Sequence, residues 1–293
     1  MNKVQKISSL RAAVSAAHKD KKTVGFVPTM GNLHEGHLEL VRVAKRRADF
    51  VVVSIYVNPT QFGKNEDLDN YPSTPEEDAR LLAELGTDLL FLPEQETMYP
   101  GKLEEQTVVY VPKIGDMYCG QDRPEHFYGV TTVVSRLFNM VQPDVAVFGN
   151  KDYQQIAIIR RMVEDLAYPI QIVGVETKRN DQGLALSSRN RYLNESEQAI
   201  APNLQATLHW LKQELAINKS VKSRAVLAKL EAQALKKLSK AGFTTQYLYI
   251  CRQRDLKPAK KGDQALVILA AAYLGKARLI DNIEVFLGDE QSS

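Results

Sequence analysis

The chain has 293 residues, of which 44% are hydrophobic and 25% charged, enough to bury one large core or two smaller ones. Its formal net charge of +3 argues against a general nucleic-acid or membrane surface, so any basic character should be local. Cys119 and Cys251 lack metal-site spacing, which argues against a disulfide framework or a zinc site and favours the cytoplasm. The N-terminus has no apolar signal core, and the longest apolar run, Ala265–Leu274, falls well short of the roughly 20 residues of a spanning helix.

Helix-like and strand-like patterns alternate through the first 175 residues. The nearly all-apolar run Phe50–Val57 is typical of a strand buried on both faces in a parallel sheet, and Thr74 to Glu77 has a capping-box pattern. The expected helices are Ser9–His18, His34–Arg47, Pro75–Gly86, Tyr128–Val141 and Asp152–Leu166. The expected strands are Val24–Pro28, Phe50–Val57, Asp88–Pro93, Thr107–Val111, Asp144–Phe148 and Pro169–Val175.

This alternation predicts an α/β fold with a Rossmann-like open parallel sheet and right-handed crossovers. Past Arg179 the order changes to two long amphipathic helices followed by three strands, which predicts a smaller C-terminal α+β domain. Those elements are Glu195–Ile217, Val221–Ala241, Thr245–Cys251, Ala265–Ala272 and Ala277–Ile283. We therefore expect one domain over residues 1–178 and another over residues 179–293.

Three polar turns follow predicted strands, at Thr29–Gly36, Asn58–Gly63 and Gly149–Asp152. Ligands of open parallel sheets bind beyond the carboxyl ends of the strands. The three turns are therefore expected to form one shared site.

The turn Thr29–Gly36 joins a strand to a helix that begins near His34. The unpaired N–H groups and the dipole of a helix N-terminus bind anions, so we expect phosphate here. His34 and His37 stand three residues apart on one face, and Gly36 leaves room for a flat ring or a sugar. A packing glycine with two ordinary loop histidines is the alternative.

The other two turns carry groups suited to a hydroxy acid and a nucleotide. Gln61 offers an amide donor and acceptor for hydroxyl and carboxylate groups, and Gln155 shares a helix face with Asp152. Lys151 can neutralise phosphate charge, while Asp152 can cap the helix or accept from a ribose hydroxyl. A solvated glutamine, a surface lysine and a plain N-cap are the corresponding alternatives.

A glycine-hinged loop follows the expected domain boundary. It begins at Gly183 and places Ser187, Ser188 and Arg189 in a row. Two hydroxyls and a guanidinium can wrap a triphosphate, and such a loop can close over it. A solvated Ser/Arg linker is the alternative.

These motifs together resemble the pantothenate synthetase (pantoate–β-alanine ligase) family of the nucleotidylyltransferase superfamily. The resemblance covers residues 24–192 and a later stretch near residues 270–282. The matching strings are Pro28-Thr-Met-Gly31-x-Leu-His34-x-Gly36-His37, Asn58-Pro-x-Gln61-Phe, Arg123-Pro-x-His126 and Ser187-Ser188-Arg189. The family usually has glutamate where this chain has Asn150.

The resemblance implies ATP-dependent condensation of (R)-pantoate with β-alanine through a pantoyl adenylate, with release of AMP and pyrophosphate. It implies that Gln61 and Gln155 bind pantoate or β-alanine, and that Mg²⁺ accompanies ATP through ligands that the sequence does not assign. The catalytic residues that it implies are His34, His37, Lys151, Ser187, Ser188 and Arg189. The ATP-binding residues that it implies are Met30, Gly31, Asn32, Leu33, His34, Glu35, Gly36, His37, Gly149, Asn150, Lys151, Asp152, Lys178, Leu186, Ser187, Ser188 and Arg189.

The resemblance also implies a cytoplasmic homodimer whose residues 179–293 act as a lid, without nucleic-acid or membrane partners. Two rival functions remain at this point. A cytidylyltransferase would keep the nucleotide on its product, and a nucleotide-binding regulator would bind ATP without turnover. Glu77 and Asp78 are weak candidates for magnesium contact, because acids are common at helix starts in any case.

Overall fold

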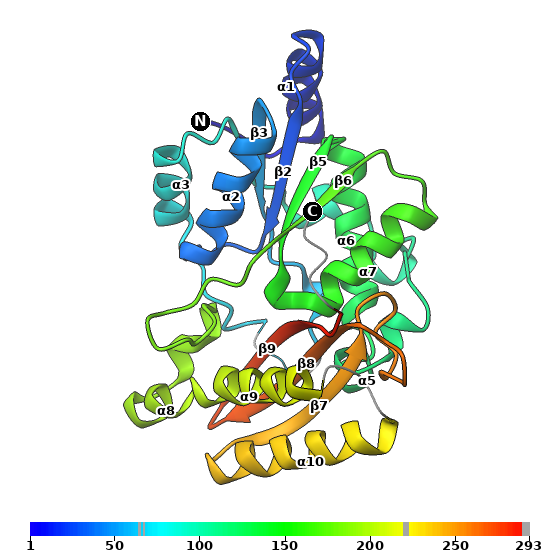
Figure 1. The fold of residues 1–293 in the computed structure, drawn as a ribbon. Coiled ribbons are helices and arrows are strands. Elements are labelled where there is room, and N and C mark those ends of the chain that lie inside the picture. Colours follow the sequence, from blue (N-terminus) through cyan, green and yellow to red (C-terminus); the bar gives the residue numbers. More distant parts are fainter. Residues whose placement is uncertain (64–65, 67, 219–222, 289–293) are drawn as a thin grey trace. The chain divides into compact units, whose positions relative to one another are not determined.

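A computed structural model describes residues 1–63, 66, 68–218 and 223–288 (Figure 1). The chain folds as two compact units. The first contains Met1–Asn150 and Gln154–Glu176, and the second contains Lys151–Tyr153 and the chain from Thr177 onward. The chain therefore contributes one short piece, Lys151–Tyr153, to the second unit before it returns to the first.

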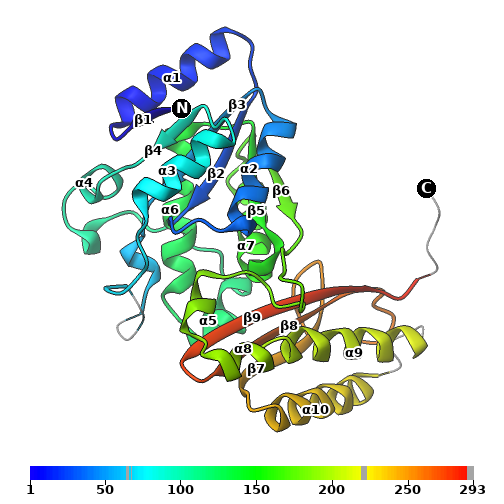
Figure 2. The ribbon, with the colours of Figure 1, turned by 90° about the vertical axis from the view of Figure 1, so that its left-hand side faces the viewer.

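The first unit contains a parallel six-stranded sheet in the order β1-β4-β3-β2-β5-β6. Its strands are β1 (Asn2–Val4), β2 (Val24–Thr29), β3 (Phe50–Ile55), β4 (Leu89–Phe91), β5 (Val145–Gly149) and β6 (Gln171–Val175). The predicted open parallel sheet is thus confirmed, with β1 as an additional strand that pairs with β4 (Figure 2).

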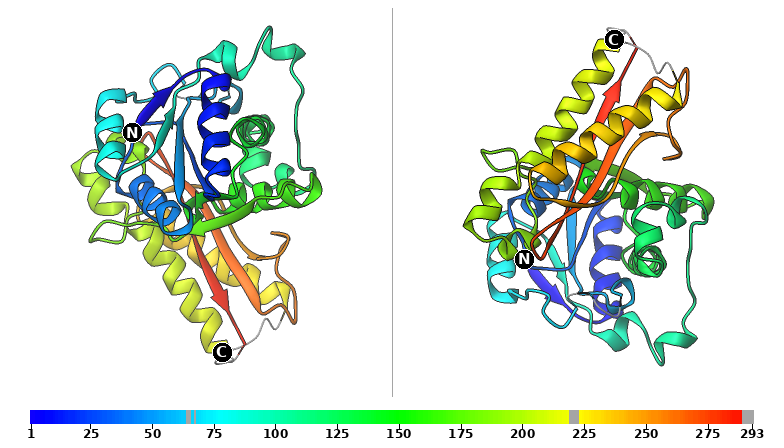
Figure 3. Two further views of the ribbon diagram at one scale, coloured as in Figure 1. Left: turned by 90° about the horizontal axis from the view of Figure 1, so that it is seen from above. Right: turned by 90° about the horizontal axis from the view of Figure 1, so that it is seen from below.

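Helices cover both faces of this sheet (Figure 3, left). They are α1 (Ile7–Lys19), α2 (Glu35–Arg47), α3 (Pro75–Glu84), α4 (Gln95–Met98), α5 (Cys119–Asp122), α6 (His126–Val141) and α7 (Tyr153–Asp165). On one face, α2 and α3 pack against strand valines in a buried apolar cluster. On the other face, Phe138 of α6 packs edge-on against Phe26 and Phe148, with ring centroids 6.4 and 6.3 Å apart.

The strand predicted at Thr107–Val111 is wrong, because this segment adopts no regular structure. The Val109 N–H donates to Thr132 Oγ1 at 3.0 Å, and its carbonyl accepts from Thr131 and Thr132. Side chains of α6 therefore satisfy a backbone that β-branched residues alone had suggested would join a sheet.

The second unit contains an antiparallel sheet in the order β7-β8-β9, as expected for an α+β domain. Its elements are α8 (Glu195–Ile200), α9 (Asn203–Asn218), α10 (Arg224–Lys240), β7 (Thr244–Arg252), β8 (Ala265–Leu274) and β9 (Ala277–Phe286). Residues of α9 and α10 pack with one face of the sheet in a single buried cluster (Figure 3, right).

The single helix predicted over Glu195–Ile217 is wrong, because it is divided at Ala201 and Pro202. Proline has no N–H for the helical ladder and its ring clashes with the preceding turn, so α8 ends there and α9 begins. The predicted start of the next helix at Val221 lies outside the described residues. Within them, α10 begins after Ser223, whose hydroxyl accepts from the Val226 N–H at 3.3 Å.

Two further properties of the described residues bear on the setting of the protein. None of the described helices combines the length and apolarity that a bilayer crossing requires. Cys119 and Cys251 are both buried free thiols.

Candidate active site

The carboxyl ends of four strands lie level along one edge of the first unit's sheet. Thr29 pairs with Ile55, and Gly149 pairs with Val175. Since β3 lies on one side of β2 and β5 on the other, the strand order reverses beside β2, which is the usual ligand position in such sheets. Pairing between β2 and β5 occurs only at Gly25 and Phe26, so it stops before Pro28, which has no N–H to donate.

The loop after β2 is fixed by a buried carboxylate. The N–H groups of Asn32 and Leu33 each donate to Asp78 at 2.8 Å, and Asp78 is only 1% exposed. Thr74 Oγ1 also donates to Asp78, at 3.0 Å, so the capping box predicted at Thr74 does not form. Asp78 therefore anchors the loop, and its oxygens are already engaged with protein donors.

The two histidines cap α2 reciprocally. The Gly36 N–H donates to His34 Nδ1 at 3.1 Å, the His34 N–H donates to His37 Nδ1 at 3.3 Å, and the ring centroids are 4.1 Å apart. An Nδ1 atom that accepts a hydrogen bond has no hydrogen of its own, so each neutral ring carries its hydrogen on Nε2. The expected anion site is thereby revised, because protein acceptors occupy these loop and helix N–H groups and the imidazole Nε2–H groups remain as donors.

The side-chain amide of Gln61 has a defined orientation. Gln61 lies at the end of the 3₁₀ turn η1 (Pro59–Gln61), where its Oε1 accepts from Asn58 Nδ2 at 3.2 Å and its Nε2 donates to Met30 Sδ at 2.8 Å. Asn58 Oδ1 in turn accepts from Tyr99 OH at 2.9 Å and from Thr60 Oγ1 at 3.0 Å. Two hydroxyl donors on one oxygen fix the Asn58 amide, and Asn58 fixes that of Gln61.

The main chain at Gln61 is held equally firmly. Its carbonyl accepts from His126 Nδ1 at 2.9 Å and from Arg123 Nη2 at 3.3 Å. Arg123 also forms an ion pair with Glu66. Burial alone would raise the pKa of Glu66, but hydrogen bonds and charge from Arg123 outweigh burial and lower it.

The segment after β5 divides between the two units. Gly149 and Asn150 end β5 and begin the 3₁₀ turn η4 (Asn150–Asp152), and the Asn150 side chain lies against Gly174 of β6, where an added Cβ would be 2.2 Å from Asn150 Oδ1. Gln155 lies half-buried in the first turn of α7. The neighbouring Gln154 is structural, because its amide bonds to the backbone of residues 114, 117 and 119.

In the second unit, Lys178 to Arg189 form a hairpin and a capped turn. The Leu186 N–H donates to the Lys178 carbonyl at 2.9 Å, and Ser187 caps the 3₁₀ turn η5 (Ser188–Tyr192) by accepting from the Arg189 N–H at 3.3 Å. Lys151 and Asp152 belong to the same unit. The predicted phosphate-binding residues of the two units are thus ordered separately, each by contacts of its own unit.

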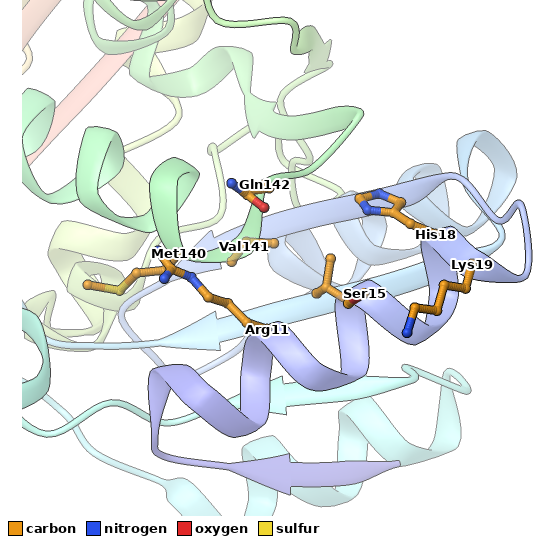
Figure 4. Close-up of a pocket in the computed structure, with 8 residues that line it drawn as sticks. Arg11, Ser15, His18, Lys19, Met140, Val141 and Gln142 are labelled. Atoms are coloured by element: carbon orange, nitrogen blue, oxygen red, sulfur yellow. The ribbon is translucent and has the colours of Figure 1, made fainter.

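A cavity of about 380 Å³ lies elsewhere, between the last turns of α1 and α6 (Figure 4). Its lining includes Arg11, His18 and Lys19, but Arg11 donates to the Asn139 carbonyl at 3.4 Å and His18 lies 3.5 Å from the Asp144 carboxylate. Helix C-termini carry partial negative charge, which these cations offset. Because β5 begins just after Asp144, the cavity is at the opposite edge of the sheet from the ligand-binding strand ends.

Comparison with known proteins identifies the family. Residues 2–284 match the family model described as pantoate-beta-alanine ligase. The chain belongs to the pantoate-beta-alanine ligase family. As a member, it is a ligase that forms pantothenate from pantoate and β-alanine with ATP.

Relatives of this ligase agree over the full length. The pantothenate synthetases of Colwellia psychrerythraea and Stutzerimonas stutzeri are 53% and 54% identical to the chain over 287 residues, covering 98% of the chain and 100% and 99% of those proteins. The crystal structure of pantothenate synthetase from Thermus thermophilus has a TM-score of 0.89 at 43% identity, covering 98% of this chain and 100% of that one. The Francisella tularensis pantoate-beta-alanine ligase, solved with β,γ-ATP and β-alanine, has a TM-score of 0.78 at 32% identity, with both chains fully covered.

Sequence reasoning missed three residues that order the ligase site, namely Asn58, Asp78 and Tyr99. The sequence offered a signal for Asn58 and Asp78, as a polar residue ending a core strand and an acid in a first helical turn, but it gave none for Tyr99. Arg123 and His126, noted from the sequence only as family matches, hold the Gln61 carbonyl.

Proposed function

We propose that this ligase acts through a pantoyl adenylate, with ATP bound by the residues predicted from the sequence. The pantoate carboxylate attacks the α-phosphorus, a P–O bond forms, and the bond to pyrophosphate breaks. The amine of β-alanine then attacks the acyl carbon, a C–N bond forms, and AMP leaves. The observation that carries this proposal is the reciprocal histidine cap, because it holds two Nε2–H donors side by side without a cationic side chain.

The first step requires positioning and charge stabilisation more than covalent chemistry by the protein. His34 and His37 donate to phosphate oxygens, with His37 favoured as the donor to charge that develops in the transition state. Lys151, Ser187, Ser188 and Arg189 supply the remaining positive and hydroxyl groups. The ATP-binding residues Met30 to His37, Gly149 to Asp152, Lys178 and Leu186 complete the set.

Gln61 and Gln155 bind pantoate or β-alanine in this proposal. The bond from Gln61 Nε2 to Met30 Sδ is a weak one, because a thioether is a poor acceptor. A pantoate hydroxyl or carboxylate oxygen is a better acceptor and replaces it. The orientation set by Asn58 therefore presents a donor to an acidic substrate.

Mg²⁺ is proposed to enter with the nucleotide. Among the described residues no group of three or more His, Cys, Asp or Glu side chains is arranged to hold a metal. This donor set fits Mg²⁺, which usually keeps several waters and binds substrate phosphates with one or two carboxylates. When bound, the ion neutralises phosphate charge. Glu77, which pairs with Arg80, and Asp78, which anchors the loop, are both engaged elsewhere.

The remaining features of the proposal concern the whole protein. Residues 179–293 act as a lid that excludes water from the mixed anhydride, in line with the family resemblance. A cytoplasmic homodimer follows from the same resemblance, and the two free cysteines suit a reducing compartment. Light scattering of the purified protein tests the dimer, for which a mass near twice 32.9 kDa is expected.

A substrate-omission assay tests the reaction. ATP–pyrophosphate exchange should require pantoate but not β-alanine, whereas sustained AMP release should require both. His37→Ala should lower the exchange rate at least about 100-fold, as expected for loss of a transition-state donor. His18→Ala is the matched control, because His18 lies in α1 beside Asp144, and it should exchange at the wild-type rate. Exchange without pantoate, or equal rates in the two histidine variants, would contradict the mechanism.

A further inference from the structure

Strand β9 carries two adjacent polar residues that are largely buried. Asp281 is 4% exposed and Asn282 is 9% exposed. Because side chains alternate along a strand, Asp281 lies on the same face as Leu279 and Ile283, which pack in the apolar cluster of this unit, and Asn282 lies on the opposite face. A buried carboxylate and a buried amide both need partners, and each has one in a predicted phosphate-binding segment.

Asp281 holds the hairpin that leads into Ser187. It accepts from Arg179 Nη1 at 2.6 Å and from Arg179 Nη2 at 2.8 Å, a two-pronged contact. Arg179 Nη1 also donates to the Gly183 carbonyl at 3.1 Å, and Arg179 is bridged to Ala185 across the hairpin. Fixing Arg179 therefore fixes both sides of the hairpin from which the Ser187 turn emerges.

The turn itself is tied back to that hairpin. Asn190 Nδ2 donates to the Ala185 carbonyl at 2.9 Å, and the Leu186 N–H bonds to the Lys178 carbonyl. Ser187 follows Leu186 directly in the chain. The position of Ser187, Ser188 and Arg189 is consequently set through Arg179 by a residue of β9 about a hundred positions later in the sequence.

Asn282 holds the other segment. Its Nδ2 donates to the Lys151 carbonyl at 2.9 Å, while two residues further along each chain Tyr153 OH donates to Glu284 Oε1 at 2.7 Å. Residues 282 and 284 share a face of β9, so the two contacts run side by side. They account for the membership of Lys151–Tyr153 in the second unit.

We propose that Asp281 and Asn282 are positioning residues that make β9 the common support of Lys151 and of the Ser187–Arg189 turn. The inference deepens the proposed function and rests on it, since it presumes that both segments bind the triphosphate. A displacement of about 1 Å in a group that positions substrate costs on the order of 100-fold in rate. Loss of either contact should therefore appear in the adenylation step, with little effect on pantoate binding.

A double-mutant cycle of the full chain tests the Asn282 contact. Asn282→Ala should lower kcat/KM for ATP in pantoate-dependent ATP–pyrophosphate exchange by about 10-fold or more and leave the KM for pantoate unchanged. In a Lys151→Ala background the same change should have no further effect, because the group that Asn282 places is already gone. A structural weakening would instead lower the rate equally in both backgrounds.

The control is Asn203→Ala. Asn203 Nδ2 donates to the Ile200 carbonyl at 2.8 Å, a bond of the same kind in the same unit but remote from β9. This variant should exchange at the wild-type rate. Thermal unfolding of the Asn203 and Asn282 variants checks that both are folded at the assay temperature.

Arg179→Lys tests the Asp281 contact, because lysine keeps the charge but loses the planar fork. It should lower kcat/KM for ATP, and Arg189→Ala should abolish most of that effect. An Asn282→Ala enzyme within twofold of wild type, or effects that multiply in the double variants, would overturn the inference while leaving the proposed function standing. A Lys151→Ala enzyme with wild-type exchange would overturn the proposed function, and the inference with it.

Discussion

At the scale of single residues, the amide of Asn58 links the buried interior to a predicted substrate contact. Asn58 is 1% exposed, and its Nδ2 donates both to Gln61 and to the Gly129 carbonyl at 3.1 Å. Burial raises the pKa of Tyr99, so its phenol stays protonated and donates to Asn58. Tyr99 thus determines which end of the Gln61 amide faces a substrate, although it lies one residue behind the contact.

Tyr99→Phe should raise the KM for pantoate several-fold and lower stability by about 1 kcal/mol, because one hydrogen bond to the Asn58 amide is lost. Tyr56→Phe is its control, since the Tyr56 ring lies 6.3 Å away and its hydroxyl has no hydrogen-bond partner among the described residues. That variant should keep the pantoate KM and be as stable as wild type or slightly more so. Steady-state kinetics and urea unfolding of both proteins make the comparison, and equal pantoate KM values would contradict it.

Glu66→Gln should reduce stability by roughly 1 kcal/mol at neutral pH, since the partly exposed pair with Arg123 is lost. The folded-state pKa of Glu66 is lowered, so its contribution is fully present above the unfolded value of about 4.3 and disappears as the pH falls through the folded value. The free-energy difference between wild type and variant should therefore shrink below about pH 4.3. Urea unfolding at several pH values measures it, and a pH-independent difference would show that the charge is irrelevant.

At the scale of elements, sequence patterns predicted most helices and strands but failed where tertiary contacts or a proline decided the outcome. The β-branched run near Val109 looked like a strand, yet α6 hydroxyls satisfy its backbone. The amphipathic pattern after Glu195 continued across Pro202, but the helix could not. Such failures arise because hydrophobic periodicity does not report where backbone groups find partners.

The close contact between α6 and η1 gives a prediction at this scale. A Cβ added to Gly129 would lie 2.3 Å from the Thr60 carbonyl oxygen and 2.5 Å from the Gln61 nitrogen. Gly129→Ala should therefore displace Gln61, raise the pantoate KM at least about 10-fold and cost about 1–3 kcal/mol. Any gain in helix propensity, at most about 1 kcal/mol, is too small to offset this clash.

Gly262→Ala is the stability-matched control for Gly129→Ala. Gly262 has φ +90° with open space around it, so alanine there should cost about 1–2 kcal/mol through backbone strain alone. It should leave the pantoate KM unchanged. Similar pantoate KM values in the two glycine variants would mean that general destabilisation, not displacement of Gln61, is responsible.

At the scale of the whole molecule, the motif letters predicted the family and the fold, but not how the chain divides between its units. Lys151 follows a strand of the first unit, and only the contacts of Lys151 and Tyr153 with β9 show that it belongs to the second. A pattern of neighbouring residues contains no information about a partner 131 positions away. The residues that would touch ligands could thus be predicted from sequence, whereas those that hold them in place could not.

Hydrogen exchange of the full chain tests whether both units bind the same nucleotide. A non-hydrolysable ATP analogue should slow amide exchange both at the start of α2, near His37, and in η5, near Arg189. Pantoate alone should slow exchange mainly around Gln61. Protection by the nucleotide that is confined to one unit would contradict the assignment of the other.

The burial of both native thiols, Cys119 and Cys251, has a practical consequence. Maleimide dyes react with accessible thiolates, so a cysteine introduced on the surface of each unit can be labelled in preference to the natural pair under native conditions. Energy transfer between two such fluorophores then becomes a ruler for opening and closing during turnover, in an enzyme whose own cysteines need not be removed first.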